Sequence, residues 1–119
     1  FKSPQWTPGK NFDGSGACGP WFVTADELPA GAKGLRISTR VNGRIEQDAN
    51  TNDMIFGVAT LIAIASQAMT LIPGDMIAPG TPAGVGFGKK PPVYLRAGDV
   101  CEVEIERIGV LRNPVALEA

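Results

Sequence analysis

The feature that most restricts the fold of this chain is an Asn42-Gly43 pair set between two short segments of mixed polarity. Residues 35–41 alternate apolar and polar side chains, and residues 44–47 follow the pair. A two-residue type I′ turn needs positive φ at both central residues, which Asn and Gly tolerate best. The pattern therefore predicts a β-hairpin.

A second pair of strands is predicted near the end of the chain. A Gly-Asp turn at residues 98–99 precedes a predicted strand over residues 100–107. Along it, apolar residues at 101, 103 and 105 alternate with glutamates at 102, 104 and 106, so the two sets project from opposite faces. Residues 109–115 are expected to form a strand that pairs with it as a hairpin.

A long helix is predicted over residues 52–69. Thr51 or Asn52 is the expected N-cap, and Asp53 lies where the helix dipole favours negative charge. Apolar residues recur at helical spacing and also fill most of the other faces, so burial on more than one side is expected. The apolar stretch 54–65 is well short of the roughly 20 residues that a membrane span requires, so no span is predicted.

Segments rich in glycine and proline separate these elements. Residues 1–20 and 79–86 are predicted to be ordered loops. A short strand is expected at residues 21–24 and another at 76–78. Thr24–Glu27 has the spacing of a capping box and predicts one helical turn.

Together these elements predict one domain over residues 1–119, of the α+β class and mostly β. A chain of 119 residues would bury only about 60 to 68% of its unfolded surface, so completion by further protein is expected. The start at Phe1, without an initiator methionine, agrees with that expectation.

Composition excludes several functions for this chain acting alone. Its 11 basic and 12 acidic residues include no basic run longer than Lys89-Lys90, so nucleic-acid binding is not expected. The chain has no histidine, which excludes a Ser/His/Asp or Cys/His catalytic set. Cys18 and Cys101 form no CxxC motif, and we expect both to be reduced in a cytoplasmic protein, with a disulfide left open.

Three groups are candidates for chemistry. Lys10 lies in a glycine-flanked loop and is able to stabilise an enolate, although most loop lysines simply face water. The backbone and hydroxyl at Gly80-Thr81 suit a carboxylate, although a plain turn explains them equally. Glu102, Glu104 and Glu106 could bind a hard cation, but an ordinary solvated strand face is favoured.

Several segments also match one family in order and spacing, and together they cover almost the whole chain. They resemble the C-terminal half of fumarylacetoacetate hydrolase family proteins. The matching segments are Gln5-Trp6, Gly9–Asp13, Gly19–Trp21, Val41–Gly43, Asn52–Phe56, Met69–Leu71, Pro73–Asp75, Gly80–Gly86, Leu95, Gly98-Asp99 and Val103–Gly109.

The resemblance implies a mixed β-roll and a homodimer. It also implies a Mg²⁺ or Mn²⁺ ion held by two glutamates of an E-x-E strand and by an aspartate. All three ligands would lie upstream of Phe1, so no metal ligand is expected in this chain, and the N-terminal half of the domain is an expected partner. The glutamates at 102 and 104 match a different strand of the family, which supports their solvated interpretation.

The resemblance assigns roles to four residues. Lys10 matches an active-site lysine beside the metal, and Thr81 matches a threonine that contacts the substrate carboxylate. Gly80 would let the backbone approach the substrate, and Asp13 would orient Lys10 or its loop. One departure is Pro79, which stands where many members have threonine and removes both a backbone donor and a hydroxyl.

The implied substrate is a 2-oxo or enolic acid. Hydrolysis of a C–C bond in a fumarylacetoacetate- or acylpyruvate-like diketo acid is the first expectation. Isomerisation or decarboxylation of a hydroxymuconate- or oxaloacetate-type diacid is the alternative, because a shared scaffold does not fix the reaction. A noncatalytic fragment without a metal site is a further alternative.

Overall fold

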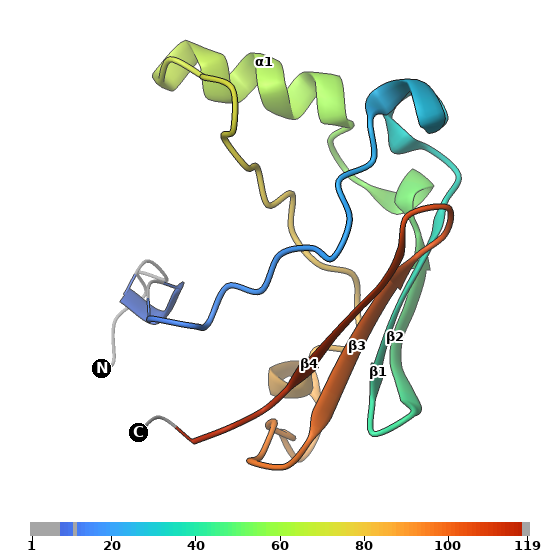
Figure 1. The fold of residues 1–119 in the computed structure, drawn as a ribbon, viewed down its shortest axis with the longest axis vertical. Helices are drawn as coiled ribbons and strands as arrows, with labels where there is room; N and C mark the ends of the chain where they lie inside the picture. Colours follow the sequence, from blue (N-terminus) through green and yellow to red (C-terminus); the bar gives the residue numbers. More distant parts are fainter. Residues whose placement is uncertain (1–7, 11, 118–119) are drawn as a thin grey trace.

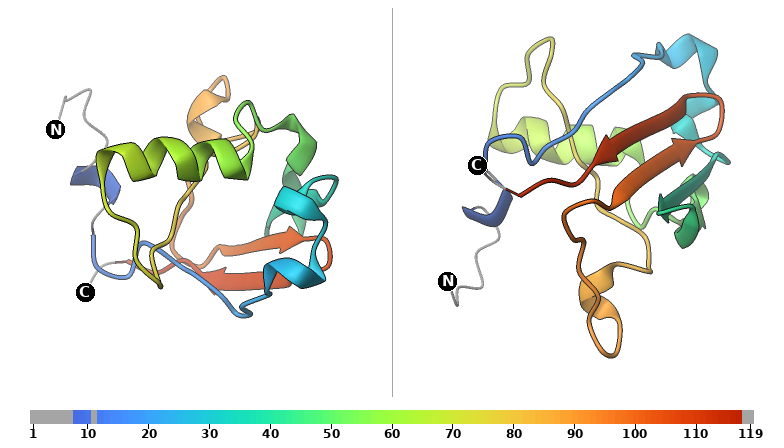
Figure 2. Two further views of the ribbon diagram at one scale, coloured as in Figure 1. Left: turned by 90° about the horizontal axis from the view of Figure 1, so that it is seen from above. Right: turned by 60° about the horizontal axis from the view of Figure 1, so that its bottom comes forward.

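The computed structural model describes residues 8–10 and 12–117 and contains one antiparallel sheet with the strand order β2-β1-β3-β4. The strands are β1 (Arg36–Val41), β2 (Arg44–Asn50), β3 (Val100–Ile105) and β4 (Gly109–Pro114). The helix α1 (Val58–Ala68) stands off from the sheet, as both Figure 1 and Figure 2 show. The α+β, mostly β class is confirmed. The mixed β-roll expected for residues 1–119 is not seen in the described residues, because every strand pair there is antiparallel.

The hairpin predicted from Asn42-Gly43 is present. Asn42 has φ 51° and Gly43 has φ 79°, which are the two positive angles that a type I′ turn requires. The strands β1 and β2 pair on either side of this turn, from Val41 opposite Arg44 to Arg36 opposite Asn50. Local backbone chemistry is therefore sufficient to set this part of the register.

A β-bulge interrupts the pairing of β1 with β2. Thr39 lies opposite Gln47, whereas its neighbour Arg40 lies opposite Ile45, so Glu46 is an extra residue on β2. Successive residues of a regular strand point to opposite faces, and a bulge breaks that alternation. As a result, Glu46 and Gln47 both line the same cavity.

The other predicted hairpin is also present, and its pairing with β1 gives the sheet two unlike faces. We call the face with Ile37, Thr39 and Val41 the pocket face; Val103 and Cys101 lie on it, directly opposite Thr39 and Val41. The opposite face, which we call the charged face, carries Arg36, Ser38, Arg40, Glu102 and Glu104.

Ion pairs occupy the charged face. Arg40 reaches Glu104 at 2.8 Å and Glu102 at 3.6 Å, and Arg112 reaches Glu102 at 3.4 Å. Arg36 forms two parallel hydrogen bonds to Asp48, of 2.8 and 2.7 Å. The alternating glutamates of β3 thus face arginines on neighbouring strands rather than forming a metal cluster.

The helix differs from its prediction in length and burial. It was predicted over residues 52–69 as a buried helix, but α1 spans Val58–Ala68 and has no buried residue. Thr51–Asp53 forms a separate 3-10 turn, η4, closed by a capping box between Asn50 and Asp53. The expected caps Thr51 and Asn52 lie inside this turn, and α1 begins only after Gly57, its N-cap.

Two predicted short strands are absent. Residues 21–24 and 76–78 have no strand partner within the described residues and run as irregular chain. The turn predicted at Thr24–Glu27 is present as the 3-10 turn η2 (Ala25–Glu27). The remaining 3-10 turns are η1 (Pro8–Lys10), η3 (Ala30–Ala32), which contacts α1, and η5 (Gly86–Gly88).

The chain exposes much more surface than a self-contained domain of its size. Its accessible area is 9836 Å², whereas a folded monomer of this mass has about 6,200 Å². Among the described residues only Leu35, at 2%, and Ser38, at 4%, are buried. Phe22 and Ile55 are 93% and 91% exposed. No described helix is long and apolar enough to cross a membrane.

The Arg36–Asp48 pair leads to a prediction about acid stability. Hydrogen bonding from Arg36 lowers the pKa of Asp48 below its ordinary value of 3.8, against a smaller opposing effect of desolvation. A lowered native pKa gives stability that is present above the ordinary value and is lost as the pH falls through the native value. The unfolding free energy of Asp48→Asn should therefore decline less steeply than that of the unaltered protein below about pH 4.

Urea unfolding monitored by circular dichroism at a series of pH values would measure this slope. The size of the effect should be small, because both side chains are exposed. Arg36→Gln should flatten the slope in the same way. A full slope in Arg36→Gln would show that another group causes the acid sensitivity.

Candidate functional site

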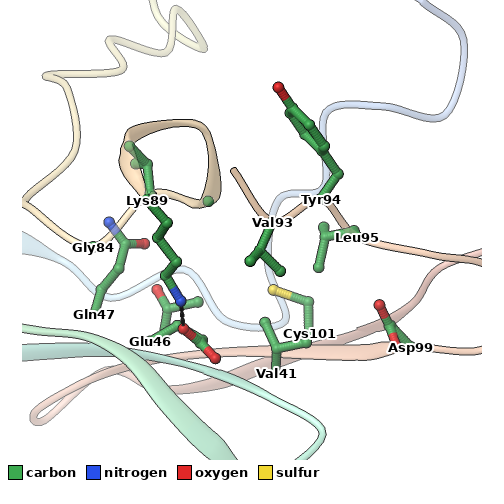
Figure 3. Close-up of a pocket in the computed structure, with 13 residues that line it drawn as sticks. Val41, Glu46, Gln47, Gly84, Lys89, Val93, Tyr94, Leu95, Asp99 and Cys101 are labelled. Carbon is green, nitrogen blue, oxygen red and sulfur yellow. Dashed lines mark hydrogen bonds and ion pairs between the residues drawn. The ribbon is translucent and has the colours of Figure 1, made fainter. Parts of the chain in front are cut away.

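A cavity of about 290 Å³ lies between the pocket face of the sheet and the returning segment 84–95. Apolar side chains form most of its wall, among them Val41, Val93 and Leu95. Figure 3 shows Tyr94 and Cys101 on one side, and Glu46, Gln47 and Lys89 on the other. Thr39 and Asp99 also line the cavity.

An ion pair between Lys89 and Glu46 forms the polar side of the cavity. Both side chains are half-buried, so little water is available to solvate either charge if the pair separates. Hydrogen bonding from Lys89 lowers the pKa of Glu46, while desolvation acts in the opposite direction. The pair fastens the segment after η5 to β2 at the bulge.

Next to this pair, Gln47 holds the loop that contains Thr81. Its amide nitrogen Nε2 donates to Thr81 Oγ1 and to the carbonyl oxygen of Pro82, each at 2.9 Å. The carbonyl oxygen of Ala83 lies at 3.4 Å from the same nitrogen. One side chain of β2 therefore fixes three consecutive residues of the loop.

Two glycines allow the loop to lie this close to its neighbours. A β-carbon added to Gly84, whose φ is 104°, would overlap the carbonyl oxygen of Glu46. A β-carbon added to Gly86 would overlap the carbonyl oxygen of Val93. The Gly84-Val85-Gly86 sequence is therefore a steric requirement for the backbone contact.

The predicted carboxylate-binding residues lie at the exposed side of this loop. Gly80 has φ 114°, an angle at which a residue with a side chain would be strained. A β-carbon added to it would have no neighbouring atom within 4 Å. Thr81 is exposed although Gln47 holds its hydroxyl. Pro79 and Pro82 have no backbone N–H, so an anion at this loop would meet the N–H groups of Gly80, Thr81 and Ala83.

Lys10, the last residue of η1, and Asp13 are both exposed. The segment that begins with η1 lies away from the sheet in Figure 1. The ion pairs of the described residues include neither side chain. No hydrogen bond in that part of the chain joins Lys10 to Thr81. The predicted roles of both residues therefore stay predictions, and Gln5, Trp6 and Asn11 of the family pattern lie outside the described residues.

Nothing in residues 8–10 and 12–117 suits a metal ion. These residues contain no group of three or more His, Cys, Asp or Glu side chains that could hold one. Glu102 and Glu104 pair with arginines on the neighbouring strands. Cys18 and Cys101 are free, as expected.

The profile of the family described as "Fumarylacetoacetate (FAA) hydrolase C-terminal" matches residues 1–116 of the chain. The chain belongs to this family. Family membership confirms the resemblance drawn from the ordered motifs. The matched region includes the loop around Thr81 and the segment around Lys10.

Named family members include enzymes that act on oxo acids. The chain is 50% identical over 111 residues to the mitochondrial oxaloacetate tautomerase Fahd2a of Rattus norvegicus, covering 93% of the chain and 35% of that protein. It superposes with a TM-score of 0.87 and 48% identity on a fumarylacetoacetate hydrolase of Exiguobacterium antarcticum, covering 93% of this chain and 39% of that one.

A third family member is a maleylpyruvate hydrolase of Sphingobium sp. SYK-6 in complex with manganese(II) and pyruvate. The TM-score is 0.71 and the identity 41%, over 82% of this chain and 34% of that one. The chain spans about a third of the length of the curated relatives it matches, at 35% of the rat protein and 34% of a Xenopus laevis tautomerase.

The sequence analysis missed the residues that hold the loop containing Thr81 in place. Glu46 and Gln47 were assigned only to a hairpin strand, where alternation would point them to opposite faces. The bulge that brings them together has no local signal comparable to Asn42-Gly43. A hint was available in Gly84 and Gly86, because an isolated glycine often marks close backbone approach.

The close approach at Gly84 gives a second prediction. Gly84→Ala should destabilise the protein by roughly 1–3 kcal/mol more than Gly74→Ala, because only the former introduces a clash with backbone. Gly74 is a matched control: its φ is 99°, close to that of Gly84, but its surroundings are open. Thermal and urea unfolding of the two variants would measure the difference. Equal losses would attribute the cost to backbone angle alone.

Proposed function

We propose that the protein containing this chain is a metal-dependent enzyme acting on a 2-oxo diacid, and that it interconverts the keto and enol forms of oxaloacetate or a close analogue. The observation that carries the proposal is the docked loop, which presents an exposed Thr81 hydroxyl on a rigid support. The 50% identity to a protein named oxaloacetate tautomerase supports the choice of substrate.

In this proposal the loop binds one carboxylate of the substrate. The Thr81 hydroxyl and the free N–H groups of the loop donate hydrogen bonds to its oxygens. Binding at this end orients the carbon next to the keto group for transfer of a proton to a base, either water or a group outside the described residues. The keto oxygen then becomes an enolate oxygen, which gains negative charge as the C–H bond breaks. The same base later returns the proton to the oxygen.

Lys10 is proposed to stabilise that developing charge. A lysine ammonium placed near an enolate oxygen lowers the energy of the charged state. Protonation of the oxygen completes the enol, and the same steps in reverse return the keto acid. The exposed position of Lys10 in the first part of the chain requires that further protein bring it and Thr81 to one substrate.

A divalent cation is proposed as the cofactor, with Mg²⁺ and Mn²⁺ as the candidates. The described residues do not fit a metal, so its ligands would come from protein outside them. Support comes from the maleylpyruvate hydrolase solved with manganese(II). When bound, such an ion polarises the oxygens of a chelating 2-oxo acid.

Completion by more protein is part of the proposal. The excess accessible area and the exposed apolar residues, including Phe22 and Ile55, are surface that an N-terminal half and a second copy in a homodimer would cover. The compartment is also a proposal, with cytoplasm as the expectation from composition and mitochondria the location in the rat relative's name.

Hydrolysis of a C–C bond in an acylpyruvate-like acid is the second candidate reaction. It is supported by the TM-score of 0.87 to a fumarylacetoacetate hydrolase. The two reactions are separable: enol formation changes ultraviolet absorbance without new products, whereas hydrolysis releases two acids that chromatography resolves. An inert protein with both substrate classes would instead favour the noncatalytic alternative.

Metal removal tests the cofactor. Treatment of the full-length protein with EDTA should abolish keto–enol conversion of oxaloacetate above the spontaneous rate, and added Mg²⁺ or Mn²⁺ should restore it. The assay follows enol absorbance, with elemental analysis of the same sample as a control for removal. Full activity in a sample shown to be metal-free would contradict the proposal.

Substitution of Lys10 tests its assigned role. Lys10→Met keeps most of the side-chain length but removes the charge, and it should lower kcat by roughly 10²- to 10³-fold with little change in KM. Lys33→Met, at another exposed lysine, is the matched control and should retain activity. A rise in KM without a drop in kcat would assign Lys10 to substrate capture instead.

A further inference from the structure

The orientation of the Gln47 side-chain amide is fixed by its surroundings. A backbone carbonyl oxygen only accepts hydrogen bonds, so the atom that contacts the carbonyl oxygen of Pro82 at 2.9 Å must be the donating nitrogen. The carbonyl oxygen of Ala83 on the same side reinforces this assignment. Figure 3 shows the nitrogen beside Gly84 and directed away from Val93 and Leu95.

This orientation determines what the Thr81 hydroxyl is able to do. The same Nε2 lies 2.9 Å from Thr81 Oγ1, so the hydroxyl oxygen accepts a hydrogen bond from Gln47. Nε2 has two hydrogens and no lone pair to offer, so the hydroxyl hydrogen has to point elsewhere. Because Thr81 is exposed, this hydrogen is available to an incoming acceptor.

The bulge on β2 makes this arrangement possible. Gln47 lies opposite Thr39 on the pocket face, beside the extra residue Glu46. Glu46 in turn binds Lys89, which fixes the segment after the loop. Gly84 lets the loop backbone come down onto β2, so Gln47 reaches three loop residues at once.

From this geometry we propose that Gln47 is a positioning residue that presents the Thr81 hydroxyl to the substrate carboxylate as a hydrogen-bond donor. The inference rests on the proposed function, since it names how the same loop recognises its substrate. Gln47 itself does not touch the substrate. By donating to Thr81 Oγ1, it leaves the Thr81 hydroxyl as a donor toward the substrate. A carboxylate only accepts hydrogen bonds, so it is the group that suits this donor.

Gln47→Glu is the decisive variant because it keeps the shape of the side chain and removes the donor. The Thr81 hydroxyl would then donate to the carboxylate introduced at position 47 and would no longer be available to the substrate. In the full-length, Mn²⁺-loaded protein, the dissociation constant for pyruvate should rise by roughly 10- to 100-fold, as for loss of one hydrogen bond to a charged group. The KM for oxaloacetate should rise similarly, with kcat changed by less than about threefold.

Thr81→Val and the double variant separate positioning from simple support of the loop. Thr81→Val should weaken pyruvate binding to a similar extent. If Gln47 acts through Thr81, Gln47→Glu should add little to Thr81→Val. Effects that multiply in full in the double variant would overturn the proposal, because Gln47 would then act on the loop backbone alone. Thr81→Ser, which keeps the hydroxyl, should retain binding within about fivefold.

An NMR measurement tests the Gln47–Thr81 hydrogen bond without any enzyme assay, so it is independent of the proposed function. The side-chain amide resonances of Gln47 should move in the nitrogen–proton NMR spectrum of Thr81→Val and should remain in place in Thr81→Ser. Unchanged resonances in Thr81→Val would overturn the hydrogen bond itself. If the resonances move but the unaltered protein neither binds pyruvate nor converts oxaloacetate, the substrate class and the proposed function fail while the Gln47–Thr81 contact stands.

Discussion

The pairing of β1 with β3 is the interaction on which the rest of this structure depends. It joins residues near 40 to residues near 100, with Val41 opposite Cys101 for example, and so places the two hairpins in one sheet. The chain between them must leave the sheet at Thr51 and return at Asp99. The segment between these points contains α1 and the loop of Thr81. The loop packs against β2 because Gln47 binds Thr81, Glu46 pairs with Lys89, and Gly84 allows close backbone contact.

The parts of the fold that depend on neighbouring residues could be predicted from the sequence. Asn42-Gly43 determined its own turn, and the alternating glutamates of β3 placed that strand's faces correctly. The helix was predicted too long because Thr51–Asp53 carries good capping residues, which the structure uses for a separate turn. The bulge at Glu46 and the hydrogen bonds from Gln47 could not be predicted, since both involve a loop more than 30 residues further along. The sequence named Thr81 but not Gln47, which holds it, and the role of Thr81 stays a prediction.

The helix α1 was expected to be buried because of its apolar composition. Its apolar side chains surround the helix, and an isolated helix of this kind would be poorly solvated. In the described chain they remain exposed, with Ile62 at 45% and Ile64 at 52%. The apolar composition is therefore matched to surroundings that residues 8–10 and 12–117 do not provide. The same reasoning applies to Lys10, whose proposed role would need neighbours from beyond its own loop.

The two outer strands of the sheet limit how this protein is able to assemble. The free edge of β2 is interrupted by the bulge at Glu46, and the free edge of β4 ends in Pro114, which has no N–H to donate. Within the described residues, the β2 edge is thus irregular at its bulge, and the β4 edge lacks one donor at its last residue. A strand added at either edge would have to accommodate this interruption, which restricts the registers it could adopt. The bulge and the proline thus work against the long, regular edge-to-edge pairing of cross-β aggregates, while the apolar side chains on α1 stay available for packing.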